Sequence, residues 1–226
     1  ELSSRHIHHL VEVARTLGGV EAGEAAALLR ESGNMKYEDV EDVMNGFDGW
    51  IDSLDPAAVI ESASLLLYVS EKFVKDEGYT ADVLERCKEG YTGLYNYYSS
   101  VNAQVVVVIL EGIIGIARRY PTFFNDSTIS VPRFGDPEEV ICLRMELLSI
   151  NTSAERLSYI MCQLKTFMLD TANQEVIING LVAIGRQSRE KAGIVVSGIV
   201  DVLNMRINRR TEVLLASGVV RLIEYY

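Results

Sequence analysis

The chain has 226 residues, of which 48% are apolar and 23% charged, and its formal net charge is −11. This length and apolar content are sufficient for a large buried core in one or two domains. The acidic balance argues against a nucleic-acid-binding protein, because neutralising phosphates requires a basic surface.

Segments with helical apolar periodicity dominate the sequence, and the short, turn-bounded strand patterns of a β-sandwich are hard to find. A first helix is predicted over residues 5–17. Residues 18–36 mix glycines with alanine and leucine and predict only a short helix, and the turn-rich residues 122–134 predict an irregular or shortened element. Amphipathic helices are predicted over residues 37–52, 80–98, 153–169 and 190–205.

Between these segments, a turn ending in Asp or Asn recurs ahead of a strongly apolar stretch. The turn ends at Asp55, Asn102, Asp136, Asn173 and Asn208. These positions are 47, 34, 37 and 35 residues apart. An Asp or Asn at a helix N-cap accepts a hydrogen bond from a free backbone N–H, and Pro56 and Pro137 suit the first helical position. Each turn is therefore predicted to begin a helix, with a period close to the roughly 40 residues of HEAT and armadillo repeats.

The stretches after these turns are apolar on more than one face, so neighbours must cover them on several sides. We therefore predict an all-α, HEAT/armadillo-like right-handed α-solenoid of antiparallel helix pairs. Residues 1–226 would form one continuous segment of about five to six repeats. Almost complete burial is expected for Val140, Leu143, Leu147, Val176, Leu181 and Ile184.

The sequence begins without Met and ends in apolar sequence at Tyr226, so we expect part of a longer trunk. An internal piece of a solenoid exposes an apolar face that the next repeat would cover. That face is predicted to comprise Leu214, Leu215, Val219, Val220, Leu222 and Ile223.

Residues suited to catalysis or metal binding are few. Cys87, Cys142 and Cys162 are irregularly spaced and fit neither a disulfide framework nor a zinc site, and Cys142 and Cys162 lie in apolar stripes that predict burial. The only histidines, His6, His8 and His9, have no HExxH-type partner. We therefore predict a protein that is not an enzyme and has no cofactor and no metal site.

Two pairs of glycines, Gly112 with Gly115 and Gly180 with Gly185, lie inside apolar helices. Neither pair has the spacing or the lysine of a phosphate-binding loop. They are predicted instead to allow close approach between helices.

Charge is unevenly distributed along the chain. Residues 1–100 contain 8 Lys/Arg and 19 Asp/Glu, whereas residues 186–221 contain seven basic and three acidic residues. Such asymmetry can mark a partner-facing end. The candidate strip for a partner or an anionic membrane comprises Arg186, Arg189, Lys191, Arg206, Arg209 and Arg210. The alternative is a solvated face whose cations pair with Glu190, Asp201 and Glu212.

Residues 134–188 resemble the trunk of the β-type large chains of clathrin-adaptor complexes, the β-adaptins. The resemblance lies in Phe134 followed by Asp136-Pro137, an apolar helix from Val140 to Leu148, an Asn-containing turn at Asn151, and a helix that ends in Ala183-Ile184-Gly185-Arg186. It is looser over residues 45–133, and residues 1–44 barely share it. Residues 122–134 and 208–213 depart from the family pattern.

The resemblance implies a non-catalytic scaffold subunit of a heterotetrameric coat adaptor. Its partners would be the medium and small chains and a second large chain, and it would lie on the cytosolic face of Golgi, endosomal or plasma membranes. The alternatives are another HEAT or armadillo scaffold, such as a transport receptor or a phosphatase-type scaffold, and an enzyme with a helical fold.

Overall fold

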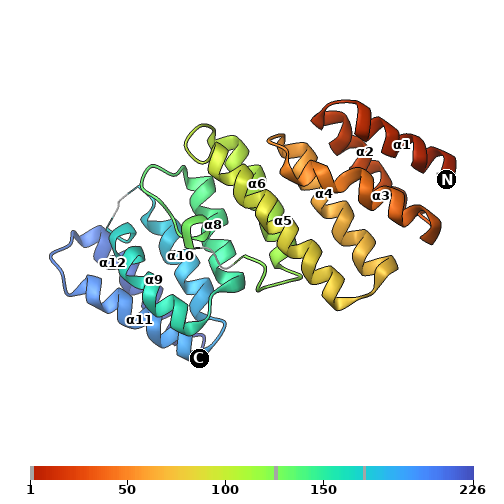
Figure 1. The fold of residues 1–226 in the computed structure, drawn as a ribbon. Helices are drawn as coiled ribbons and strands as arrows, with labels where there is room; N and C mark the ends of the chain where they lie inside the picture. Colours follow the sequence, from red (N-terminus) through yellow and green to blue (C-terminus); the bar gives the residue numbers. More distant parts are fainter. Residues whose placement is uncertain (1–2, 125–126, 170–171) are drawn as a thin grey trace. The chain divides into compact units, whose positions relative to one another are not determined.

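The computed structural model describes residues 3–124, 127–169 and 172–226 (Figure 1). Over these residues the chain forms twelve α-helices and no β-strand, which confirms the predicted all-α class. Most helices pack against helices that are near them in sequence. The chain divides into two compact units, Glu1–Ile116 and Ala117–Tyr226, each of which is described by itself. The single continuous array over residues 1–226 stays a prediction.

The first unit contains the helices α1 to α6. Short 3-10 turns at Tyr37–Asp39 and Asp48–Asp52 flank α3, and a π-helical turn at Ser70–Val74 follows α4. The predicted amphipathic segment 37–52 therefore forms a short α-helix with a 3-10 turn at each end. The bounds are α1 (Ser4–Thr16), α2 (Gly19–Ser32), α3 (Val40–Phe47), α4 (Pro56–Val69), α5 (Glu77–Tyr98) and α6 (Ala103–Ala117).

Helix α2 is the largest departure from the sequence prediction, because residues 19–32 form a complete helix. It packs against both α1 and α4. A Cβ on Gly23 would lie only 2.9 Å from the backbone carbonyl of Ala57, so this glycine permits the close approach of α4. Gly23, one of the glycines that suggested a broken element, thus serves the packing between two helices.

The second unit contains a single turn, α7, and five longer helices. Helix α10 packs against α8 and α12, while α11 packs against α9, α10 and α12. These contacts place α8, α10 and α12 in one layer and α9 and α11 in another. The bounds are α7 (Ser127–Ser130), α8 (Glu138–Asn151), α9 (Ala154–Phe167), α10 (Gln174–Gly185), α11 (Arg189–Leu203) and α12 (Arg209–Ile223).

Three of the five predicted caps form as expected. The side chains of Asp55, Asn102 and Asn208 accept hydrogen bonds from backbone N–H groups in the first turns of α4, α6 and α12. Asn173 occupies the N-cap position of α10 without a side-chain cap bond.

The prediction for Asp136 was wrong. Its carboxylate accepts a hydrogen bond from the backbone N–H of Arg133 and pairs with Arg144. Pro137 stands at the N-cap of α8, one residue before the first helical position predicted for it.

Burial agrees with the sequence prediction at four of the six chosen positions. Leu143 and Val176 are only half-buried, whereas the other four are almost completely buried: Val140, Leu147, Leu181 and Ile184. Next to Leu143, the charged side chain of Arg144 takes the buried position, with 1% of its surface exposed. Helical periodicity did not reveal this, because an arginine is normally assigned to solvent.

The predicted exposed face of α12 is shifted around the helix. Leu215 and Leu222 are buried in the core of the second unit, where Leu222 lies against Gly185. Leu214 and Val219 are half-buried, and only Val220 and Ile223 of the predicted set are exposed. The true exposed side of α12 also includes Val213.

Candidate functional site

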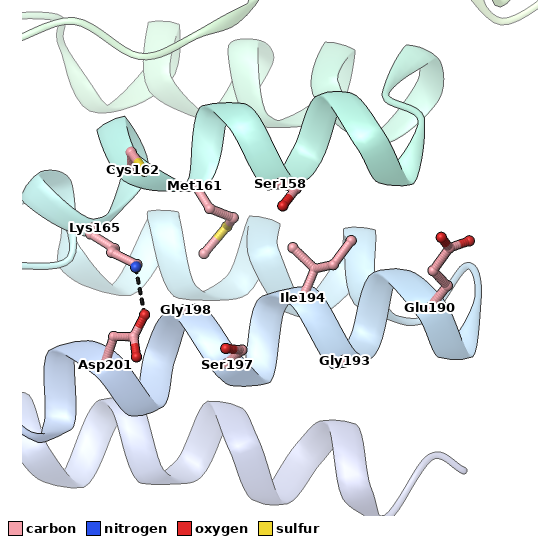
Figure 2. Close-up of a pocket in the computed structure, with 10 residues that line it drawn as sticks. All are labelled: Ser158, Met161, Cys162, Lys165, Glu190, Gly193, Ile194, Ser197, Gly198 and Asp201. Carbon is pink, nitrogen blue, oxygen red and sulfur yellow. Dashed lines mark hydrogen bonds and ion pairs between the residues drawn. The ribbon is translucent and has the colours of Figure 1, made fainter.

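A shallow groove of about 460 Å³ runs between the outer helices α9 and α11 of the second unit (Figure 2). Helix α9 contributes Ser158, Met161, Cys162 and Lys165 to its lining. Helix α11 contributes Glu190, Gly193, Ile194, Ser197, Gly198 and Asp201. Three small residues of α11, Gly193, Ser197 and Gly198, leave space between the helices that larger side chains would fill.

Two glycines of α11 define the profile of this groove. A Cβ on Gly198 would meet the terminal methyl group of Met161, so α9 and α11 touch at this level. A Cβ on Gly193 would meet no atom within 4 Å. The groove is therefore closed beside Gly198 and open one and a half turns away beside Gly193.

The electrostatics of the groove are dominated by carboxylates. The ammonium group of Lys165 pairs with Asp201 across the groove, with 2.6 Å between Nζ and Oδ2 (Figure 2). Glu190 lines the groove as well, and Glu155 lines its continuation beside Tyr159. With a single cation among three carboxylates, the groove favours cationic over anionic ligands.

The reactive groups in the groove do not form a catalytic arrangement. Cys162 is exposed there, and Cys142 is exposed in a second groove between α8 and α10, so the prediction that both are buried was wrong. Each belongs to an apolar stripe in sequence but occupies its solvent-facing edge. The lining of the α9–α11 groove contains no histidine to activate Cys162. Among the described residues, no group of three or more His, Cys, Asp or Glu side chains is suited to hold a metal ion.

The basic residues predicted from sequence form two groups. Arg186, Arg189 and Lys191 surround the turn between α10 and α11. The guanidinium of Arg186 lies 5.3 Å from the ring centre of Tyr225, and that of Arg189 lies 5.9 Å from the ring centre of Tyr226. Both contacts are of the cation–π type.

Lys191 in the same group is half-buried, and burial lowers the pKa of its ammonium group. Its Nζ donates a hydrogen bond to the side chain of Gln187 at 2.7 Å. Together with the two cation–π contacts, this bond makes the first group a set of cations with partners inside the unit. Sequence reasoning missed the two tyrosines because contacts between distant positions leave no local signal.

The second group, Arg206, Arg209 and Arg210, surrounds the turn between α11 and α12. All three side chains are exposed. Within the described part of the chain none of them forms an ion pair, and Asp201 pairs instead with Lys165. The alternative reading, in which Asp201 and Glu212 neutralise these arginines, therefore gains no support from the described ion pairs.

The two groups lie at opposite ends of α11. This helix has 15 residues, so at a rise of 1.5 Å per residue its ends are about 22 Å apart. The structure thus brings the six residues together as two sets of three at the two ends of the layer, and not along a single line.

The charge of the protein is unevenly divided between the two units. The first unit carries 8 basic and 20 acidic residues, whereas the second carries 13 basic and 12 acidic residues. The three arginines without ion pairs thus belong to a nearly neutral unit.

No model of a known protein family matches this sequence, and a search among curated proteins finds no match. Among the helices in the described residues, none is both long enough and apolar enough to cross a bilayer.

Proposed function

We propose that this chain is a non-catalytic scaffold, built as a HEAT/armadillo-like right-handed α-solenoid, that holds other proteins. The support from the second unit is the layering of its helices, with α8, α10 and α12 on one side and α9 and α11 on the other. One cluster of buried apolar residues runs through all five of these helices. Such a continuous core between successive helix pairs is typical of solenoid repeats.

The observation that carries the proposal is the group formed by Arg206, Arg209 and Arg210. Three exposed arginines at one turn, without ion pairs among the described residues, present a cluster of donors for carboxylates. A guanidinium binds a carboxylate through two parallel hydrogen bonds, which gives direction as well as attraction. We therefore propose an acidic segment of a partner protein as the ligand of this turn.

The finer proposal follows from the resemblance of residues 134–188 to β-adaptins. In it, the chain is part of a large subunit of a vesicle-coat adaptor on the cytosolic face of a Golgi, endosomal or plasma membrane. Its partners are the medium and small chains and a second large chain. Its support is the residue pattern from Phe134 to Arg186.

The test is co-purification of the chain with the medium, small and second large chains of a coat adaptor. A variant carrying Arg206→Glu and Arg210→Glu should lose the complex, and the loss should be greatest at low salt, where exposed charges are least screened. The matched control carries Arg5→Glu and Lys36→Glu, two exposed positions of the first unit with the same total charge change. Wild-type chain that captures none of these subunits would refute the adaptor assignment.

A second experiment distinguishes an acidic protein partner from an anionic lipid surface as the ligand of this turn. Wild-type chain and the double variant are mixed with neutral phosphatidylcholine vesicles and with vesicles containing phosphatidylserine. Near an anionic surface each arginine contributes about 1 kcal/mol, so two reversals should be easily detected if lipid is the ligand. Binding to the phosphatidylserine vesicles that depends on Arg206 and Arg210 would replace the protein partner by the membrane.

A further inference from the structure

An exposed stripe runs along α12 on the side opposite the core of the second unit. At 3.6 residues per turn, four of its residues fall within a sector of about 60°: Arg209, Val213, Val220 and Glu224. Val213 is 61% exposed and Val220 is 49% exposed. The small residues Ala216 and Ser217 lie on either side of the middle of this stripe and are exposed as well.

The buried side of the same helix faces away from the stripe. Leu215 and Leu222 point into the core, and a Cβ on Gly218 would meet Ile178 of α10. These positions lie about half a turn away from the stripe. The valines of the stripe therefore take no part in packing α12 against the rest of the second unit.

The stripe has an approximate two-fold symmetry in its own sequence. An axis between Ala216 and Ser217 relates Val213 to Val220 and Arg209 to Glu224. The apolar positions are thus equal about the centre, while the two ends carry opposite charges. An isologous contact between two copies requires this kind of self-complementarity, because each patch must fit itself after a two-fold rotation.

The end charges are unfavourable within one chain. Arg209 begins α12, where the helix dipole favours an anion, and Glu224 follows its last residue, where the dipole favours a cation. They are 15 residues apart, about 22 Å along the helix, so they cannot pair with each other. Neither forms an ion pair with any described residue of the chain.

We propose that α12 is a self-association surface on which a second copy of this chain packs with its own α12 antiparallel. Val213 then contacts Val220 of the second copy, and the small residues at the centre allow the helices to cross closely. Arg209 pairs with Glu224 of the second copy, and the same pair forms again at the other end. Each charge also reaches the end of the facing helix whose dipole favours it. A parallel arrangement is disfavoured because it places like charges opposite each other.

The contact is of the weak kind. One pair of 15-residue helices buries less than the ~1,200 Å² below which protein interfaces are generally transient. The association is therefore to be measured by sedimentation velocity from about 1 µM to about 1 mM, at low and at high salt. The chain alone is used, so the result is independent of the proposed adaptor function.

The decisive variants exchange the two end charges. Arg209→Glu or Glu224→Arg alone places like charges across both ends of the contact and should raise the dissociation constant about tenfold. The double variant restores opposite charges and should return to within about threefold of wild type. Arg206→Glu, which lies outside the stripe, is the control for total charge and should leave the dimer intact.

A second set of measurements guards against misfolding. Val213→Asp should abolish the dimer while the circular dichroism spectrum stays unchanged, because the side chain is exposed in the single copy. A wild-type chain that remains monomeric up to about 1 mM overturns the proposal. Assembly that grows beyond a dimer, or a double variant that stays as weak as the single ones, overturns it as well, since both outcomes point to a different surface.

Discussion

The guanidinium of Arg144 and the carboxylate of Asp136 form an ion pair with 2.8 Å between Nε and Oδ2, and the exposed fractions of the two side chains are 2% and 15%. Arg144 also donates a hydrogen bond to the backbone carbonyl of Ile129. This arginine therefore ties α8 both to α7 and to the loop that precedes α8. Its position makes the connection an integral part of the fold of the second unit.

Replacing Arg144 with Met should lower the free energy of unfolding by about 3–5 kcal/mol, because Asp136 is left as a nearly buried charge without its partner. The double variant Arg144→Met with Asp136→Asn should lose less, since no charge then remains unpaired. Urea denaturation of the four proteins in this cycle measures the coupling. Arg118→Ala, which breaks the exposed pair with Glu146, should cost at most about 1 kcal/mol and serves as the control.

Two glycines three residues apart in α5 should respond in opposite directions to alanine. A Cβ on Gly90 would lie 2.6 Å from the backbone oxygen of Ile51, so Gly90→Ala forces two backbone segments apart and should cost about 1–3 kcal/mol. A Cβ on Gly93 would meet nothing within 4 Å, so Gly93→Ala should stabilise the helix by roughly 0.5–1 kcal/mol. Thermal unfolding of both variants checks the signs, and equal effects would contradict the close contact at Gly90.

The three thiols should differ in reactivity. Cys142 and Cys162 are exposed, whereas Cys87 is buried. In the native protein at pH 8, a disulfide reagent should therefore modify two thiols, and the third only after unfolding. Cys142 should react more slowly than Cys162, because partial burial and the nearby charges of Glu138 and Glu139 raise the pKa of its thiol. Rapid modification of Cys87 in the folded chain would show that α5 is not packed as described.

Stability should fall at alkaline pH in a way that depends on Cys87. Burial raises the pKa of its thiol from 9.0 to about 12. A folded-state pKa above the unfolded value means that this contribution to stability is complete below about pH 9 and is lost as the pH rises from about 9 to about 12. Burial also raises the pKa of the Tyr91 hydroxyl, so the fall should steepen above its usual value of 10.0.

Unfolding measured at successive pH values above 8 tests this alkaline loss. Cys87→Ala should give a shallower decline than wild type, whatever its effect at neutral pH. Cys162→Ala changes an exposed thiol and should leave the slope as it is. A Cys87→Ala variant with an unaltered slope would mean that the buried thiol does not contribute.

Helix positions were largely predictable from the sequence because the apolar period of a helix is a local signal. The predicted segments 80–98, 153–169 and 190–205 correspond to α5, α9 and α11 within a few residues. Residues 127–130 form only the single turn of α7, in agreement with the irregular element predicted over 122–134. Of the glycines predicted to allow close approach, Gly112, Gly180 and Gly185 each face a packed side chain, but Gly115 does not.

What the sequence could not supply was the direction of individual side chains around each helix. A periodic pattern does not say whether Cys162 lies at the centre or at the edge of an apolar stripe. It also does not say that Asp136 turns back toward Arg144 instead of capping α8. The six basic residues were predicted as one strip from the uneven distribution of charge along the chain, but the length of α11 separates them into two groups.

The two ends of the groove between α9 and α11 differ in the space they offer to a larger side chain. Gly198 and Met161 are in contact, so this point sets the distance between the two helices. The ion pair between Lys165 and Asp201 also links the two helices at the closed end of the groove. A side chain added at Gly193 would therefore enter open space, whereas one added at Gly198 would push α9 and α11 apart.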